Sequence, residues 1–385
     1  MKIVIAPDSF KGSLTAKQAA ESIHAGLLQA LPQADYELIP MADGGEGTVQ
    51  SLVDAKGGTF QNVDVLNPFG ETVSARYGLI EHGKTAVIEM SAASGIQFIR
   101  ENQTDPLAAS SYGTGQLMLD AMHRGARELI IGIGGSATTD GGQGMAAALG
   151  VRFLNKQNQE IHLGGGGLGD LDHIDVSQID SLVSDTHIRI ASDVTNPLVG
   201  PNGSAFVFGP QKGANPQMVH LLDENLRHYA AIIQHDLGKK LADYPGAGAA
   251  GGLGAGLLAF TNAVMAKGIE IVVDTTDFKK CVENADFIIT GEGSIDFQTQ
   301  YGKTPIGVAQ AAKAVSPQAT VLALAGHVGE GIDPLYKLGI DAVFSILPGV
   351  QTLPEAIEKA ASNLSRAAEN IGRLIAETTM PPKGL

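Results

Sequence analysis

The chain has 385 residues, of which 44% are hydrophobic, and this is enough to build the cores of two domains. Its formal net charge of −15 argues against a nucleic acid or an anionic membrane as its partner. The single cysteine excludes an internal disulfide, and the first apolar run is too short for a signal peptide, so a cytoplasmic protein is expected.

The first part of the chain alternates between strand and helix patterns. Strands are expected over 2–6 and 36–40, and helices over 15–31 and about 46–55. Thr15 followed three residues later by Gln18 is a capping box, which marks the start of the first helix. This β-α-β-α rhythm favours a parallel sheet with helices on its faces.

The pattern changes near residue 60, where short β-prone runs follow one another across tight turns and predict antiparallel hairpins of a second domain. Strands are expected over 60–66, 72–80, 85–90, 129–133, 151–154, 187–194 and 205–208, and helices over 115–122, 216–237 and 253–266. Residues 246–266 carry no charge, but their first half is mostly glycine and alanine, which contribute little transfer energy. A Gly-rich loop and a buried helix are therefore expected there, rather than a membrane span.

The β-α rhythm returns near residue 284. Strands are expected over 286–290, 320–325 and 342–347, and helices from 305 and over 354–377. Two N-terminal and three C-terminal strands would together form one five-stranded, doubly wound sheet. The expected organisation is a discontinuous domain over 1–67 and 284–385, an inserted α/β domain over 68–283, and an active site in the cleft between them.

The stretch that attracts most attention is a glycine-rich loop between a buried strand and a short helix. It carries Gly134, Gly135, Ser136, Thr138 and Asp140. Glycine amides and the N-terminus of the helix expected from Gln143 would favour a bound anion. The carboxylate in the same loop suggests that a divalent cation accompanies a phosphate.

The Asp-Gly-Gly pattern of this loop occurs twice. Asp43-Gly44-Gly45-Glu46-Gly47 has the same form as Asp140-Gly141-Gly142-Gln143-Gly144, and each follows an apolar run and precedes a helical one. Two tight turns would explain both copies, because Asp before Gly favours turns. The repetition makes a ligand-binding role the preferred hypothesis.

Several common signatures are incomplete. Gly302-Lys303-Thr304 resembles the end of a Walker A loop, but Phe297 stands where its first glycine belongs. Gly132, Gly134 and Ala137 match a relaxed dinucleotide fingerprint, but no acidic residue ends a second strand about twenty residues later. The histidines show no metal-ligand spacing.

What remains is a set of acidic residues in glycine-rich loops at strand ends. They are Asp8, Asp43, Glu46, Asp140, Asp193, Glu292 and Asp296, and Lys11, Lys212 and Lys303 lie beside such loops. Glycine amides, a few lysines and carboxylates that hold Mg²⁺ are the groups that phosphoryl transfer requires.

These motifs together resemble the bacterial type I glycerate kinases. The resemblance is carried by Ala6-Pro7-Asp8-Ser9-Phe10-Lys11, Ala42-Asp43-Gly44-Gly45-Glu46-Gly47-Thr48, Gly132-Ile133-Gly134-Gly135-Ser136-Ala137-Thr138, Ser192-Asp193-Val194-Thr195-Asn196-Pro197-Leu198, Phe208-Gly209-Pro210-Gln211-Lys212-Gly213 and Thr290-Gly291-Glu292-Gly293. It covers nearly the whole chain, with the motifs in family order. It implies a flavodoxin-like domain built from both chain ends, a second α/β domain inserted in it, and transfer of a phosphoryl group from ATP to D-glycerate with Mg²⁺, giving 2-phosphoglycerate.

On this basis we assign hypothetical roles. Asp193 is expected to act as a base or metal ligand, and Lys11 to bind the glycerate carboxylate or the transferred phosphoryl group. Asp8, Ser9, Asp43, Glu46 and Asn196 are expected to bind substrate. Gly134, Gly135, Ser136, Thr138, Lys212 and Lys303 are expected to bind the nucleotide phosphates, and Asp193, Glu292 and Asp296 to bind the metal.

Three alternatives remain open at this stage: phosphorylation of the 3-hydroxyl of glycerate, an NAD-dependent dehydrogenase, and a non-catalytic sensor of nucleotides or small acids. The expected partners are small molecules only, and the chain could be a monomer or a homodimer.

Overall fold

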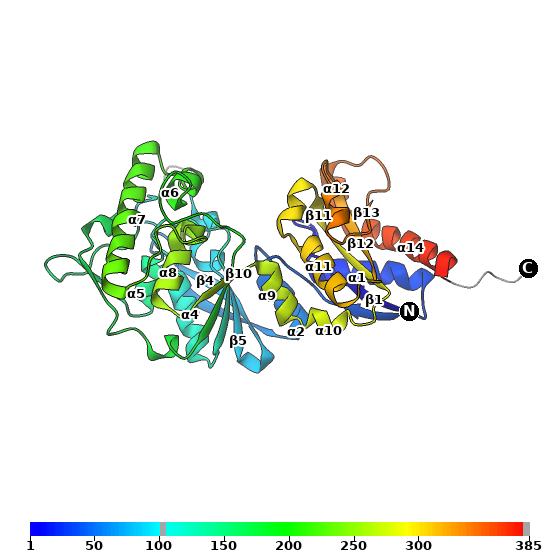
Figure 1. Cartoon of the computed structure of the whole chain (residues 1–385), viewed down its shortest axis with the longest axis horizontal. Coiled ribbons are helices and arrows are strands. Elements are labelled where there is room, and N and C mark those ends of the chain that lie inside the picture. Colours follow the sequence, from blue (N-terminus) through cyan, green and yellow to red (C-terminus); the bar gives the residue numbers. More distant parts are fainter. Residues whose placement is uncertain (101–104, 380–385) are drawn as a thin grey trace, which may run out of the picture. The chain divides into compact units, whose positions relative to one another are not determined.

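The computed structural model describes residues 1–100 and 105–379, and the chain divides into two compact units (Figure 1). Unit 1 comprises Met1–Asp43, Gln50–Gly57 and Ile269–Leu385, and unit 2 comprises Gly44–Val49 and Gly58–Gly268.

The strands of unit 1 form one parallel sheet in the order β13-β12-β11-β1-β2. They are β1 (Lys2–Ile5), β2 (Asp35–Leu38), β11 (Phe287–Ile295), β12 (Thr320–Val328) and β13 (Ala342–Ser345). Numbered within the unit, this order is 2-1-3-4-5, which is the flavodoxin-like order with its switch point between β1 and β11. The predicted fold class is confirmed.

Helices surround this sheet. They are α1 (Ala16–Ala30), α2 (Thr48–Lys56), α9 (Gly268–Thr275), α10 (Phe278–Cys281), α11 (Thr304–Val315), α12 (Asp333–Lys337), α13 (Leu353–Glu358) and α14 (Ala360–Thr379). Thr15 and Gln18 form the predicted capping box of α1. Ile23 of α1, Ile371 of α14 and Ile5 of β1 belong to one buried cluster, where each large aliphatic side chain contributes about 1.5–3 kcal/mol.

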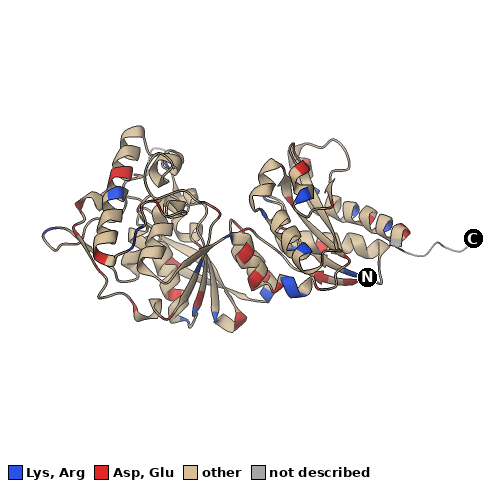
Figure 2. Ribbon diagram, in the orientation of Figure 1, with Lys and Arg blue, Asp and Glu red and all other residues tan. Residues whose placement is uncertain are grey.

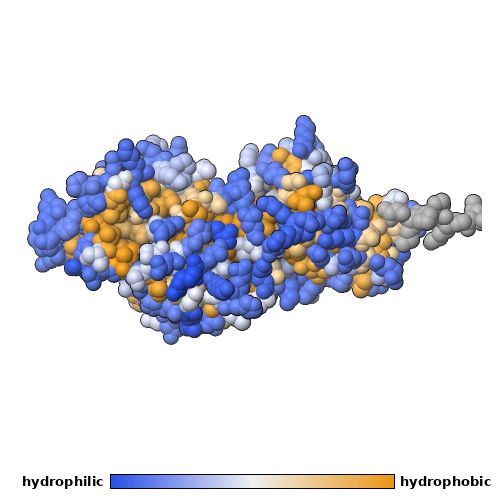
Figure 3. Space-filling model, turned by 60° about the horizontal axis from the view of Figure 1, so that its bottom comes forward, coloured by the Kyte–Doolittle hydropathy of each residue, from blue (hydrophilic) through white to orange (hydrophobic). Residues whose placement is uncertain are grey.

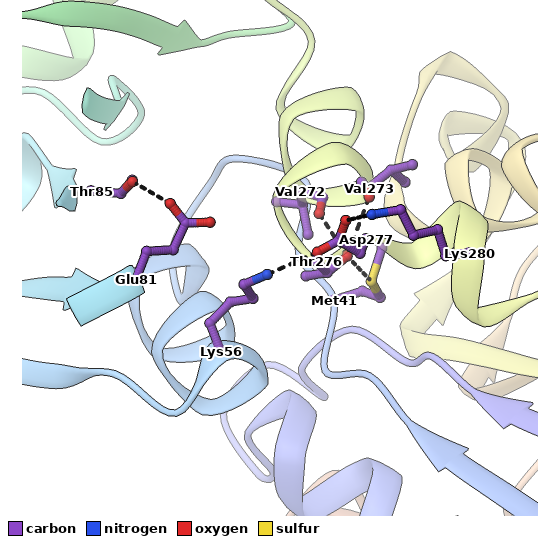
Figure 4. A network of polar contacts seen from close by, with 9 residues as sticks. All are labelled: Met41, Lys56, Glu81, Thr85, Val272, Val273, Thr276, Asp277 and Lys280. Atoms are coloured by element: carbon purple, nitrogen blue, oxygen red, sulfur yellow. Dashed lines mark hydrogen bonds and ion pairs between the residues drawn. The ribbon is translucent and has the colours of Figure 1, made fainter. Parts of the chain in front are cut away.

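Helices α9 and α10, which the sequence analysis missed, are joined to α2 through Asp277 (Figure 4). The Asp277 carboxylate pairs with Lys280 at 2.8 Å and with Lys56 at 3.0 Å. Hydrogen bonds from these two lysines lower its pKa to about 2. The Thr276 hydroxyl donates to the Val272 carbonyl at 2.8 Å and closes the last turn of α9. Because Asp277 is half-exposed, its ion pairs position the two helices more than they stabilise them.

Unit 2 contains a six-stranded sheet in the order β10-β9-β6-β5-β4-β3. Its strands are β3 (Thr59–Leu66), β4 (Thr72–Ile80), β5 (Thr85–Glu89), β6 (Glu128–Gly132), β9 (His187–Ala191) and β10 (Val264–Ala266), and β7 (Arg152–Leu154) pairs separately with β8 (His173–Asp175). Pairing is parallel from β10 to β5 and antiparallel from β5 to β3, so the predicted hairpins are confirmed.

The helices of unit 2 include short and long segments: α3 (Ser91–Ser94), α4 (Tyr112–His123), α5 (Gln143–Ala148), α6 (Ser204–Phe208), α7 (Pro216–Leu237) and α8 (Leu253–Phe260). The start of α7, with Asn215 as its cap and Pro216 in its first turn, and its end at Gly238 agree with the prediction. The core of the unit lies between the sheet and helices α4, α5, α7 and α8, whose buried apolar side chains form one cluster.

Three expectations for the elements are wrong. Residues 205–208 are the helix α6 rather than a strand, because Phe206 packs edge-on against His220 of α7. The helix expected over 253–266 ends at Phe260, and 264–266 form β10 beside β9. The last helix breaks at Lys359 into α13 and α14.

The expected domain limits also differ from those of the two units. β3 pairs with all eight facing residues of β4, so 59–66 belong with unit 2 rather than with the N-terminal strands. Residues 269–283, expected in the inserted domain, belong to unit 1. Strand pairing decides to which unit a segment belongs. A change in the sequence pattern near residue 60 or 284 gives the boundary between the units only approximately.

Charged residues of both signs are spread over the ribbons of both units (Figure 2). On the face drawn in Figure 3, hydrophobic and hydrophilic residues are interspersed. Among the described residues, no helix is both long enough and apolar enough to cross a membrane.

Candidate active site

In unit 1 the predicted acidic residues gather at the carboxyl edge of the sheet, beside its switch point. Asp8 follows β1, and its side chain is only 8% exposed. Its carboxylate accepts hydrogen bonds from the Ser9 N–H, at 2.6 Å, and from the hydroxyl of Thr304 at the start of α11. Burial, and then the neighbouring charge of Asp43, raise the pKa of Asp8 to about 7. Asp8 can therefore bind or release a proton near neutral pH.

Glu292, on the last part of β11, forms the second half of this cluster. It accepts a hydrogen bond from the Thr299 hydroxyl at 2.9 Å, and the Lys303 ammonium lies 3.9 Å from the same carboxylate oxygen. Burial raises its pKa to about 7, against the opposing effect of Lys303, and the charges of Asp8 and Asp43 raise it further. We call Asp8, Asp43 and Glu292 the carboxyl cluster.

The structure brings further predicted residues to this edge. Asp43 is half-buried and lies a few residues after β2, the strand beside β1. Lys11 is exposed, and its backbone nitrogen lies 3.4 Å from the position that a Cβ atom on Gly293 would occupy. Lys11 therefore lies beside β11, at the residue that follows Glu292 on that strand. Glu46 is exposed and belongs to unit 2.

In unit 2 the glycine loop, residues 134–138, follows β6. Gly134 and Gly135 are exposed, whereas Ser136 and Thr138 are buried. Gly135 has a φ of +72°, which a side chain with a Cβ adopts only at a cost, so the loop requires glycine there. The two exposed glycines are the part of the loop that a phosphate could approach.

Lys212 supports this loop from inside the unit. Its side chain is 3% exposed, and its ammonium donates to the Ser136 hydroxyl at 2.7 Å and to the Thr138 carbonyl at 2.6 Å. Burial lowers its pKa to about 7, although the negative charge of Asp140 opposes this shift. A direct contact of Lys212 or Thr138 with a nucleotide phosphate stays a prediction, and in the structure Lys212 holds the loop in place.

Asp140 is a structural residue. It is fully buried, and its carboxylate accepts hydrogen bonds from the N–H and the hydroxyl of Ser111, at 2.7 and 2.8 Å. The N–H groups of Gly142 and Gly144 also donate to it, at 3.1 and 3.2 Å. The amides at the start of α5 are thus already occupied, and the anion site expected at this helix N-terminus is wrong.

Asp193 and Asn196 follow β9, which pairs in parallel with β6. Because neighbouring parallel strands end at the same edge of a sheet, these residues and the glycine loop lie at one edge of unit 2. Asp193 is exposed. The Asn196 side chain donates to the Asn202 carbonyl at 2.8 Å, and the backbone carbonyl of Asn196 accepts from the N–H groups of Gly246 and Gly248.

A family model described as the glycerate kinase family matches residues 3–376. The chain belongs to the glycerate kinase family. A glycerate kinase of Halalkalibacterium halodurans is 53% identical over 369 residues, covering 96% of this chain and 97% of the relative. A glycerate 2-kinase of Escherichia coli is 47% identical, covering 98% of each chain. A crystal structure of a protein provisionally named glycerate kinase 2, from Salmonella typhimurium, superposes with a TM-score of 0.91 at 47% identity, covering 99% of this chain and all of the other.

Membership of the glycerate kinase family confirms the predicted resemblance and the prediction that the chain is an enzyme of this kind. It argues against the NAD-dependent dehydrogenase, and the geometry of the glycine loop supports the same conclusion. A dinucleotide fingerprint requires a glycine turn that opens directly into a helix. Here Ser136 forms an isolated β-bridge with Gly95, and α5 begins only at Gln143.

Sequence analysis missed several residues that support the site of this glycerate kinase family member. The hydroxyls of Thr299 and Thr304 donate to Glu292 and Asp8, yet neither threonine follows a strand. Glu89, at the end of β5, accepts from the N–H groups of Gly47 and Val49, both at 3.0 Å, and so orders the first Asp-Gly-Gly segment. Its place at a strand end among glycine-rich loops was the one available signal.

Proposed function

We propose that the protein transfers the γ-phosphoryl group of ATP to D-glycerate and releases 2-phosphoglycerate. The observation that carries this proposal is the carboxyl cluster beside Lys11 and Lys303 at the switch point of unit 1. A carboxyl group whose pKa lies near neutral pH can donate a hydrogen bond to a substrate hydroxyl or accept one from it, and so position that hydroxyl for the arriving phosphoryl group. Nearby lysines supply the positive charge that an anionic substrate requires.

The proposal divides the binding roles between the two units. In unit 2, Gly134, Gly135 and Ser136 bind phosphate oxygens through the exposed part of the glycine loop, and Asp193 acts as base or metal ligand. In unit 1, Lys11 binds the glycerate carboxylate or the transferred phosphoryl group. The proposed substrate contacts come from residues of both units: Asp8, Ser9, Asp43, Glu46 and Asn196. The nucleotide phosphates are also bound by Lys212, Thr138 and Lys303.

The residues fit a magnesium ion that is bound together with the nucleotide. Among the described residues no group of three or more His, Cys, Asp or Glu side chains could hold a metal by itself. Mg²⁺ typically takes one or two protein carboxylates and completes its shell with phosphate oxygens and water. Asp193, Glu292 and Asp296 are the proposed ligands, although Asp296 also caps a helical turn by accepting from the Gln298 N–H at 2.8 Å. When bound, the ion would neutralise charge on the transferred phosphoryl group.

The choice of the 2-hydroxyl rests on the relative named glycerate 2-kinase, and phosphorylation of the 3-hydroxyl is the alternative. A sensor without turnover is the remaining rival, and it would not need two carboxyl groups with a pKa near 7 at one strand edge.

The decisive experiment measures ADP release from ATP and Mg²⁺ with D-glycerate and with a panel of other small hydroxy acids, and identifies the product by ³¹P NMR. We expect release that depends on glycerate and a phosphate on the 2-hydroxyl. Binding of ATP without turnover on any acid would refute the catalytic proposal, and a signal from the 3-phosphate would refute the regiochemistry alone.

A further inference from the structure

Unit 2 contains a pocket of about 410 Å³ to which no role has been assigned. Its walls include the aromatic side chains of Phe69 and Tyr112 and the aliphatic side chains of Leu66 and Leu163. The Leu163 side chain is 39% exposed. The volume lies in the range of small-molecule sites, whose walls are mostly apolar with a few polar groups.

The charge of this pocket limits what it can bind. Among its described lining residues there is no Lys, Arg or His, and Asp105 contributes a carboxylate. A phosphate or the carboxylate of glycerate would therefore be repelled there. A flat, neutral ring that stacks on Phe69 or Tyr112 matches the walls.

The second Asp-Gly-Gly motif holds two walls of this pocket in place. Asp140 binds the N–H and hydroxyl of Ser111, beside the lining residues Ser110 and Tyr112. The Gln143 side chain donates to the His162 carbonyl at 3.2 Å and accepts from the Gly164 N–H at 3.0 Å. These two hydrogen bonds hold the residues on either side of Leu163. The second Asp-Gly-Gly motif therefore shapes the pocket, although it does not bind an anion.

The pocket is structurally joined to the glycine loop. The Ala137 N–H donates to the Ser94 carbonyl at 2.9 Å, and the Ile96 N–H donates to the Gly135 carbonyl at 2.8 Å. The Ser94 hydroxyl shares a 2.8 Å hydrogen bond with the hydroxyl of Thr114 in the first turn of α4, two residues after Tyr112. The first turn of α4 thus lines the pocket and contacts Ser94, whose segment is hydrogen-bonded to the glycine loop.

We propose that this pocket receives the purine base of the nucleotide whose phosphates bind at the glycine loop. The inference rests on the proposed function, because it takes ATP as the phosphoryl donor. It adds to the proposed function a binding site for the base, to which the proposed phosphate-binding residues do not contribute. It explains why half-exposed apolar side chains are held by buried polar residues at this place.

The first test fills the pocket. Ala108, which lines it and is exposed, is replaced in the full-length protein by Trp, and the dissociation constant of ADP is measured by calorimetry. Gln157→Trp, at an exposed turn of the same unit, is the matched control. We expect ADP to bind at least tenfold more weakly to Ala108→Trp and within twofold of wild type to Gln157→Trp. Inorganic tripolyphosphate, which has no base, should bind all three proteins alike.

A second test needs no variant. Wild-type protein is photolabelled with 8-azido-ATP, with and without excess ADP, and the adducts are located by mass spectrometry. ADP-sensitive adducts in 66–70, 108–112 or at Leu163 support the proposal, and adducts elsewhere overturn it. If Ala108→Trp binds ADP as wild type does while wild type phosphorylates glycerate, the base pocket is wrong and the proposed function stands. If wild type binds no ADP and shows no kinase activity, both are wrong.

Discussion

Replacing Asp8 by Asn should make the protein more stable at neutral pH while removing activity. Asp8 is buried at the switch point of unit 1 and keeps its proton up to a pH of about 7, whereas a carboxyl group in an unfolded chain releases its proton near pH 3.9. Between these values the folded state binds more protons than the unfolded state, so stability falls as the pH rises. Asn has the shape of the neutral acid but does not ionise, so the variant should not lose this stability as the pH rises.

The magnitude follows from the raised pKa. With a folded pKa of about 7, ionisation of Asp8 removes about 2 kcal/mol from the free energy of unfolding between about pH 5.5 and 7.5. This range lies above the pI of about 5.0, where association would interfere. Because the charge of Asp8 also raises the pKa of Glu292, the variant should relieve part of the cost of ionising that carboxyl group as well.

The assay is urea unfolding of wild type and Asp8→Asn at both pH values. It is followed by far-UV circular dichroism and by hydrogen exchange of unit 1 peptides, because two units can unfold separately. Asp35→Asn, an exposed acid of the same unit, is the control and should leave the pH dependence unchanged. A difference between wild type and Asp8→Asn that is the same at both pH values would show that the Asp8 pKa is not raised.

Four further variants test the proposed roles. Lys212→Met removes two hydrogen bonds that hold the glycine loop in place, and should weaken ADP binding in calorimetry. Gly135→Val strains a backbone at positive φ and should weaken ADP at least tenfold, so unchanged affinity would contradict the phosphate role. Lys11→Ala should raise KM for glycerate or lower kcat by orders of magnitude in the coupled kinase assay. Asp193→Asn should lower kcat by a similar factor, and near-normal turnover would remove it from the reaction.

The parts of the fold that local chemistry decides could be predicted from the sequence. The capping box of α1 and the Pro and Gly at the ends of α7 are such signals, and the apolar runs located all five strands of the unit 1 sheet. The four residues at 205–208 could not be assigned correctly, because a short apolar run has no periodicity that distinguishes a strand from a helical turn. The packing of Phe206 on α7 decides it.

The candidate site shows the same division. Asp8 and Glu292 could be chosen because they follow or end apolar strands, and parallel strands bring such positions to one edge. The hydroxyl partner of Asp8 could not be chosen, because Thr304 is 296 residues from Asp8 in the chain. The raised pKa of each acid depends on how deeply its carboxyl group is buried, and the local sequence does not show this.

The two Asp-Gly-Gly motifs separate local conformation from chemistry. Both use glycines at positive φ: Gly44 at +89°, and Gly141 and Gly142 at +64° and +75°. A Cβ on Gly44 would lie 2.7 Å from the Cα of Gly268, so this turn is also a close approach of two backbones. The sequence pattern therefore predicts the turns correctly. Whether the acid that begins each motif meets a ligand is a separate question, because the turn does not determine how deeply that acid is buried.

Burial gives the two acids different roles. Asp140 is fully enclosed, and donors from its own unit surround its carboxylate, so it organises Ser111 and the start of α5. Asp43 is half-buried, and its charge raises the pKa of Asp8 and Glu292. A buried carboxylate with several donors is a framework residue, and a partly exposed one beside other acids can act on a substrate. A repeated motif is thus a reason to expect a turn at each copy, and the packing around each copy decides which copy carries out chemistry.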